Sequence, residues 1–144
     1  MANTKIFIAD DDEFYANILE AKIASLGDYI IEKFYSGKSC IENAYKQPDI
    51  ILLDYKLGDT TGFEVLKEIK SVYPNIHIVM ISGQKEMKVA INSLKFGATD
   101  YLLKGYDDCD QTRLKQIIDD CDKITRSREH FSPKNKWNFL NILF

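Results

Sequence analysis

The sequence predicts an α/β domain built on a doubly wound, five-stranded parallel sheet with helices on both faces. Five short apolar runs alternate along the chain with longer segments of helical periodicity. The runs are apolar at successive positions, which is typical of parallel strands that are buried on both faces. Such strands are joined through right-handed helical crossovers, and 144 residues are enough for one domain with a substantial core.

Each expected strand is one of these short apolar runs, rich in β-branched and aliphatic residues. The five strands are expected over residues 6–9, 29–34, 50–53, 76–81 and 101–103. Pro48 and Pro74 stand just before the third and fourth of them, at positions where a helix has to end. The segments between the strands are therefore left for helices.

The expected helices are marked by apolar residues that recur every three or four positions. These residues are Phe14, Ile18, Ala21 and Leu26 for the first helix, Phe63, Leu66 and Ile69 for the third, Met87, Ala90, Ile91 and Leu94 for the fourth, and Leu114, Ile117, Ile118, Cys121 and Ile124 for the fifth. A weaker second helix is expected over 38–46. Ser36 and Thr61 are the expected N-caps, and Gly27 and Gly97 stand where helix ends need a left-handed residue.

Composition narrows the classes of partner. The net charge of −3 and the pI near 5.4 give the chain no electrostatic reason to bind nucleic acid. No apolar stretch approaches the roughly 20 residues that span a bilayer, and the N-terminus carries no export signal. We therefore expect a cytoplasmic protein without a membrane partner. Cys40, Cys109 and Cys121 are odd in number and form no CxxC pair, so they are expected to be free thiols.

Chemically active residues follow the expected strands. Asp10, Asp11 and Asp12 follow the first strand, Asp54 the third, Ser82 the fourth and Lys104 the fifth. In a doubly wound sheet the ligand site lies beyond the carboxyl ends of the strands, where the strand order reverses. In the order 2-1-3-4-5 of flavodoxin-like sheets, the first and third strands are neighbours at about 4.8 Å. Their carboxylates would then grip one cation.

Oxygen-only ligands that are open to solvent suit Mg²⁺ or Mn²⁺. These ions keep several water ligands and take a phosphate oxygen as a further ligand. Lys104 would reach Asp54 or a phosphoryl oxygen, and Ser82 would offer a hydroxyl donor between them. Asp12 is expected to be an N-cap or a peripheral charge. His77 and His130 have no partner at ligand spacing, so both are expected to be structural or solvated.

Together these motifs resemble the receiver domains of two-component response regulators, over residues 5–126. The resemblance is carried by the acidic cluster, by Asp54 with Gly62 eight residues later, and by Ser82 followed by the small Gly83. It continues with Tyr101, the aromatic of the fifth strand, and with Lys104 three residues beyond it. Each motif is weak alone, but their order and spacing together are specific.

The resemblance implies that Asp54 accepts a phosphoryl group from a sensor histidine kinase, a phosphotransfer protein or a small phosphodonor. It implies that Asp11, Asp54 and the backbone carbonyl of Lys56 bind Mg²⁺ directly, and that Asp10 acts mainly through a bound water. In the family, the hydroxyl corresponding to Ser82 then turns toward the phosphoryl group, and the aromatic corresponding to Tyr101 turns inward.

That movement re-presents the face made by the fourth helix, fifth strand and fifth helix. The domain is thus expected to be a phosphorylation switch, and an enzyme only toward its own phosphoryl group. Its output would pass through protein contacts, to a downstream target, to an output domain of its own or to a second copy.

The sequence departs from the family at one position and varies at two others. Gly105 replaces the proline that usually follows the lysine in a cis peptide, so we expect either a trans bond with unusual glycine dihedrals or a strained cis bond. Lys56 and Gln84 occupy positions that border the path of the hydrolytic water. We expect this pair to tune the lifetime of the phosphoryl group.

The receiver domain is expected to occupy residues 1–127, with 128–144 as a C-terminal extension. The segment "SPKNKWNFLNILF" within that extension ends in an aromatic and aliphatic cluster that lies outside the strand–helix pattern. It would either fold back onto the domain or act as a docking or dimerisation segment, and it would also suit a truncated linker.

Two other functions compete with the switch. A receiver-like module could bind partners without being phosphorylated. A phosphatase of the haloacid dehalogenase type places a DxD motif after its first strand, a spacing that Asp10 and Asp12 satisfy. However, Phe14 stands where that class has Thr or Val, and Asp54 is left unexplained.

Overall fold

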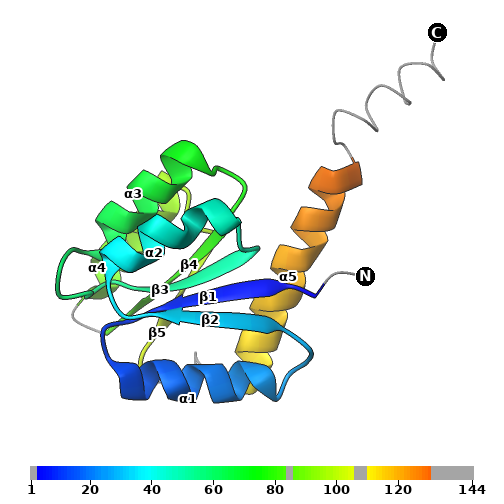
Figure 1. Cartoon of the computed structure of the whole chain (residues 1–144), viewed down its shortest axis with the longest axis horizontal. Helices are drawn as coiled ribbons and strands as arrows, with labels where there is room; N and C mark the ends of the chain where they lie inside the picture. The colour runs from blue at the N-terminus through cyan, green and yellow to red at the C-terminus, as the bar shows by residue number, and fades with distance from the viewer. Residues whose placement is uncertain (1–2, 84–85, 106–109, 131–144) are drawn as a thin grey trace, which may run out of the picture.

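The computed structural model describes residues 3–83, 86–105 and 110–130. Five parallel strands form one sheet in the order β2-β1-β3-β4-β5, as predicted (Figure 1). The strands are β1 (Lys5–Ala9), β2 (Ile30–Phe34), β3 (Ile50–Asp54), β4 (His77–Ser82) and β5 (Asp100–Leu103). Each predicted strand lies within one residue of its observed bounds, because uninterrupted apolar runs mark strands that are covered on both faces.

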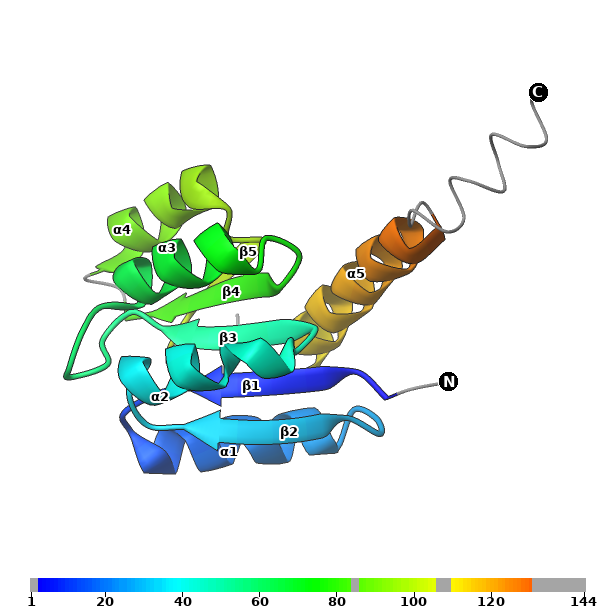
Figure 2. The same ribbon diagram turned by 45° about the horizontal axis from the view of Figure 1, so that its top comes forward.

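Helices cover both faces of this sheet. They are α1 (Glu13–Ala24), α2 (Gly37–Asn43), α3 (Gly62–Val72), α4 (Met87–Ser93) and α5 (Gln111–His130), and the short 3₁₀ helices η1 (Ala44–Lys46) and η3 (Leu94–Phe96) follow α2 and α4. Helices α1 and α5 lie on one face, and α2, α3 and α4 lie on the other (Figure 2). The predicted doubly wound architecture is therefore confirmed.

The core has two halves because successive strand residues point to opposite faces. On β1, Phe7 and Ala9 belong to the half under α2 and α3, whereas Ile6 and Ile8 belong to the half under α1 and α5. The central strand β3 is buried along its whole length. Burial raises the pKa of the Cys40 thiol to about 12, and Cys121 is likewise a buried free thiol. The prediction for Cys109 lies outside the described residues.

The predicted face of the first helix was wrong. Phe14 is 74% exposed and Ile18 is also exposed, whereas Ala16, Leu19 and Ile23 pack against the sheet. Helix α1 carries apolar residues on both sides, and periodicity alone does not tell which stripe faces the sheet. Farther along the chain, the exposed markers of the later helices are Ile91, Leu94 and Ile124.

The predicted caps hold with one exception. Side chains of Ser36 and Thr61 cap α2 and α3, and Gly97 has φ +104°. Gly27 does not adopt a left-handed conformation, because α1 ends earlier at Ser25, which stays right-handed and donates its hydroxyl to a carbonyl one turn back. Gln47, which ends η1 with φ +48°, is the one residue other than glycine with a left-handed conformation in the described part of the chain, and no pattern predicted it.

Helix α5 extends beyond the edge of the sheet (Figure 1). The predicted boundary at 127/128 therefore falls within one continuous helix, and most of the predicted extension, residues 131–144, lies outside the described residues. None of the described helices is both long and apolar enough to cross a bilayer.

Candidate functional site

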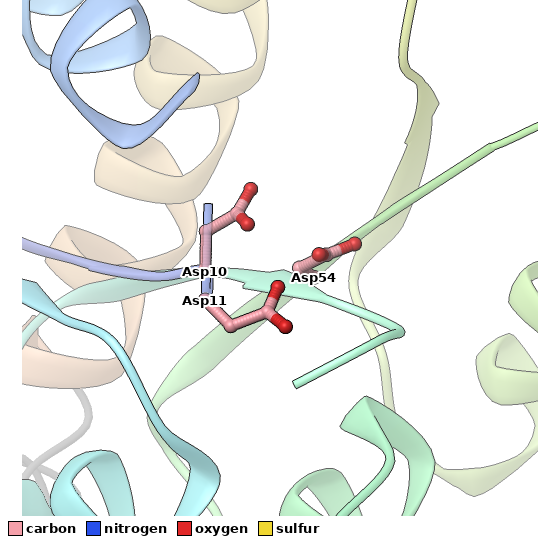
Figure 3. Close-up of side chains that lie close together, drawn as sticks. All are labelled: Asp10, Asp11 and Asp54. Atoms are coloured by element: carbon pink, nitrogen blue, oxygen red, sulfur yellow. The ribbon is translucent and has the colours of Figure 1, made fainter. Parts of the chain in front are cut away.

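Three carboxylates meet at the carboxyl ends of β1 and β3 (Figure 3). Asp10 and Asp11 follow β1, and Asp54 is the last residue of β3. One oxygen of each lies within 4.8 Å of the others, with Asp10 and Asp54 buried and Asp11 exposed. The predicted cluster forms because β1 and β3 are neighbours in register, Ala9 beside Leu53.

Local backbone structure fixes the acidic residues after β1. The amide of Asp10 donates to the carbonyl of Phe34 at 3.0 Å, which extends the pairing of β1 with β2 by one residue. One oxygen of the Asp10 carboxylate accepts from the amide of Asp12 at 2.9 Å. Asp12 in turn caps α1 by accepting from the amide of Tyr15, so the predicted N-cap role of Asp12 is confirmed.

The position of Asp54 depends on the glycine at the start of α3. A Cβ atom on Gly62 would lie 2.4 Å from the backbone oxygen of Asp54 and 2.9 Å from the Met80 side chain. The amide of Gly62 donates to the carbonyl of Tyr55 at 2.7 Å, which holds α3 against the end of β3. Only glycine permits this approach, which explains its place eight residues after Asp54.

Lys104 completes the cluster from the end of β5. Its amide donates to the carbonyl of Ser82 at 2.9 Å. Its ammonium lies 2.7 Å from Asp10 and 3.1 Å from Asp54, so it bridges the two buried carboxylates. The ammonium also lies 4.3 Å from the centre of the Tyr15 ring, a cation–π contact that the sequence analysis missed.

The electrostatics of this cluster favour a cation. Burial raises the pKa of Asp54 to about 7, the negative charge of Asp10 adds to the rise, and Lys104 opposes it. Although burial by itself would lower the pKa of Lys104, the two carboxylates raise it, so the lysine stays charged. Three carboxylates against one ammonium leave an excess of negative charge, and an oxygen-only donor set of this kind fits Mg²⁺.

The hydroxyl of Ser82 lies buried at the end of β4. The residue is fully buried, and its oxygen has no hydrogen-bond partner among the residues that the structure describes. An unpaired buried hydroxyl is unfavourable, so packing alone does not explain a serine at this position. Tyr101, one strand away on β5, is partly buried against the core half under α2 and α3.

Comparison with known proteins decides the family. The family described as "Response regulator receiver domain" matches residues 6–119. The chain belongs to this family. Receiver domains are signalling domains, and no enzyme family is indicated for this chain.

The receiver domain has relatives among much longer regulators. It is 33% identical over 106 residues to the transcriptional regulatory protein ZraR of Escherichia coli K12, covering 73% of this chain and 24% of ZraR. It is 30% identical over 141 residues to the DNA-binding transcriptional regulator NtrC of Proteus hauseri, covering 97% of this chain and 28% of NtrC. The chain thus spans about a quarter of the length of these relatives.

Solved structures support the fold. The signal receiver domain of a putative LuxO repressor from Vibrio parahaemolyticus superposes with a TM-score of 0.81 at 21% identity, covering 91% of this chain and 98% of that one. A receiver domain from Clostridium thermocellum gives a TM-score of 0.77 at 22% identity, with 87% and 97% covered. Both likenesses extend over nearly the whole described domain.

Two positions of the receiver domain were singled out for the phosphoryl lifetime. Lys56 lies two residues after Asp54, and its ammonium is 3.0 Å from the carboxylate of Glu86. Gln84 lies outside the described residues. Glu86 was missed because the two partners come from different loops, and no local pattern in the sequence links them.

The remaining predictions concern Gly105 and His77. The bond between Lys104 and Gly105 is trans and Gly105 has φ +77°, which confirms the first of the two expected geometries. His77 is buried, with its ring nitrogens 3.3 Å and 3.2 Å from the hydroxyls of Thr99 and Thr125. It lies at the start of β4, at the end of the sheet opposite the acidic cluster, in agreement with a structural role. The side chain of His130 lies outside the described residues.

Proposed function

We propose that this receiver domain is a phosphorylation switch in which Asp54 accepts the phosphoryl group. The observation that carries the proposal is the convergence at Asp54, where Asp10 and Asp11 lie within 4.8 Å and the ammonium of Lys104 at 3.1 Å. Phosphoryl transfer needs positioning and charge neutralisation more than covalent machinery, and this cluster supplies both.

The donor is a phosphohistidine of a sensor kinase or phosphotransfer protein, or a small phosphodonor. An oxygen of Asp54 attacks phosphorus in line, a new P–O bond forms as the P–N bond breaks, and the electron pair stays on the imidazole nitrogen. Asp11, Asp54 and the carbonyl of Lys56 would hold Mg²⁺ directly, and Asp10 through a water. When bound, Mg²⁺ supplies positive charge where the equatorial oxygens become negative.

Lys104 is placed for the second part of this charge. It already contacts Asp54, and on phosphorylation it would move to a phosphoryl oxygen at small cost because it stays anchored through Asp10. Ser82 would donate its unpaired hydroxyl to another phosphoryl oxygen. Tyr101 would follow inward, shifting a two-state equilibrium that alters the face of α4, β5 and α5.

Residues 1–127 are proposed as the receiver and 128–144 as an extension that docks, dimerises or links to an output domain. The output is proposed to run through protein contacts, to a downstream target, to an output domain of its own or to a second copy. Lys56 and Gln84 are proposed to set the lifetime of the phosphoryl group.

The test is intact-mass measurement after incubation with acetyl phosphate and Mg²⁺, beside an Asp54→Asn variant. A single phosphoryl adduct that requires both Mg²⁺ and Asp54 is expected. If no adduct forms and beryllofluoride does not bind either, the domain acts without phosphorylation. Turnover of a generic phosphomonoester would favour the phosphatase reading instead.

A further inference from the structure

An ion pair at the rim of the acidic pocket is not explained by the fold or by the role proposed for Asp54. Lys56 follows β3 and Glu86 immediately precedes α4, and their charged atoms lie 3.0 Å apart. The two partners differ in environment, because the Lys56 side chain is 71% exposed and the Glu86 side chain only 15%. The carboxylate therefore depends on its partner far more than the lysine does.

Strand register explains why these side chains meet. Asp54 pairs with Ile81, and the amide of Tyr55 donates to the carbonyl of Ile81 at 2.9 Å. Lys56 and Gly83 follow these paired residues by two positions each, so both lie just beyond the carboxyl ends of β3 and β4. A Cβ atom on Gly83 would lie 3.1 Å from the other carboxylate oxygen of Glu86. The Glu86 carboxylate thus lies over Gly83, just beyond Ser82 and within reach of Lys56.

This placement sets up a competition. Phosphorylation of Asp54 would add negative charge at the pocket that Lys56 and Glu86 border. That charge attracts the Lys56 ammonium and repels the Glu86 carboxylate. Lys56 is exposed and long, so it can leave Glu86 without moving the backbone, whereas Glu86 is nearly buried and loses its charge partner.

We propose that Glu86 is a positioning residue that competes with the phosphoryl group for Lys56. In the unphosphorylated protein Glu86 holds the ammonium at the rim, and on phosphorylation Lys56 passes to a phosphoryl oxygen. This inference rests on the proposed role of Asp54. Glu86 immediately precedes α4, so the loss of Lys56 as its charge partner acts on the first turn of that helix. This route to α4 is separate from the one through Ser82 and Tyr101.

Beryllofluoride with Mg²⁺, a stable phosphoryl analogue, measures this competition by titration. Glu86→Gln removes the competing charge while keeping the shape, so it should bind beryllofluoride about two- to fivefold more tightly than the wild type, the range of a part-exposed ion pair. In a Lys56→Gln background the same substitution should give a clearly smaller gain, because only the direct repulsion between Glu86 and the phosphoryl analogue is then relieved. The matched control is Glu32→Gln. It breaks the ion pair between Glu32 on β2 and Lys46 on η1, whose charged atoms lie 3.1 Å apart, and it should leave the affinity for beryllofluoride unchanged.

A double-mutant cycle of urea unfolding gives a readout that does not depend on phosphotransfer. Lys56 and Glu86 should be coupled in the free protein, and the coupling should vanish in the beryllofluoride complex. Unchanged or weaker binding by Glu86→Gln, or a gain of the same size with and without Lys56, would overturn the competition alone. A wild type that neither binds beryllofluoride nor takes a phosphoryl group would overturn the role of Asp54 as well.

Discussion

Replacing Asp54 with Asn should stabilise the protein in the absence of divalent cations, by an amount that grows with pH. The Asp54 side chain is only 7% exposed, and burial together with the charge of Asp10 raises its pKa from 3.8 to about 7. Between these values the unfolded chain has lost the proton that the folded protein still holds. Asp54 by itself therefore makes the wild type less stable as pH rises from about 4 to about 7, and this effect then levels off.

The size of this effect follows from the pKa difference. A shift from 3.8 to about 7 is roughly three pH units, and each unit is worth about 1.4 kcal/mol. The wild type should thus lose up to about 4 kcal/mol of unfolding free energy across this window, on the order of half the stability of a small domain. The asparagine side chain does not ionise, so the Asp54→Asn variant should escape that loss.

Urea unfolding at a series of pH values between 4 and 8, with chelator present, measures the difference between the two proteins. Excess Mg²⁺ should narrow it above pH 7, because the ion compensates the ionised Asp54 carboxylate, which only the wild type carries. Asp59→Asn is the control of opposite sign: the amides of Gly37 and Lys38 hydrogen-bond the Asp59 carboxylate and lower its pKa, so its removal should destabilise above pH 4. A difference between wild type and Asp54→Asn that stays constant with pH would refute the reasoning.

Three further predictions test the surroundings of the site. Gly62→Ala places a Cβ 2.4 Å from the backbone oxygen of Asp54, so urea unfolding should show a loss of about 1–3 kcal/mol, and phosphorylation should fall with it. Burial lowers the pKa of His77 to about 4, so His77 by itself makes the wild type less stable as pH falls from 6.5 to 4, and the stability of His77→Gln relative to the wild type should rise over that window in the same urea series. Tyr15→Leu removes the ring beside the Lys104 ammonium and should weaken beryllofluoride binding several-fold, whereas Tyr15→Phe should bind like the wild type.

The arrangement of the acidic site was predictable because of sheet geometry. Parallel strands bring their carboxyl ends to one edge, so residues that follow β1, β3, β4 and β5 have to meet there. Asp10, Asp54, Ser82 and Lys104 were found by this rule without any knowledge of side-chain contacts. For Gly105 the absence of the family's proline left two geometries open, and the trans bond holds because glycine takes φ +77° at little cost.

Contacts across elements were not predictable in the same way. Tyr15 resembles any partly buried helix residue until Lys104 is placed over its ring. Glu86 resembles a solvated charge until the register of β3 and β4 sets Lys56 beside it. The face of α1 failed for a related reason, since Phe14 fits an apolar stripe as well as Leu19 does, and only packing against the sheet separates them.

The two lysines give the pocket a consistent charge balance. When Asp54 is ionised, Asp10, Asp11 and Asp54 against Lys104 leave an excess of two negative charges, which is what one divalent cation would neutralise. A phosphoryl group on Asp54 would make the pocket negative again, and the nearest cation outside the cluster along the chain is Lys56, which Glu86 holds. If Lys56 moved toward the phosphoryl group, the Glu86 carboxylate before α4 would be left without a compensating positive charge. Phosphorylation would then leave the pocket close to neutral and move the uncompensated charge to a helix that can respond.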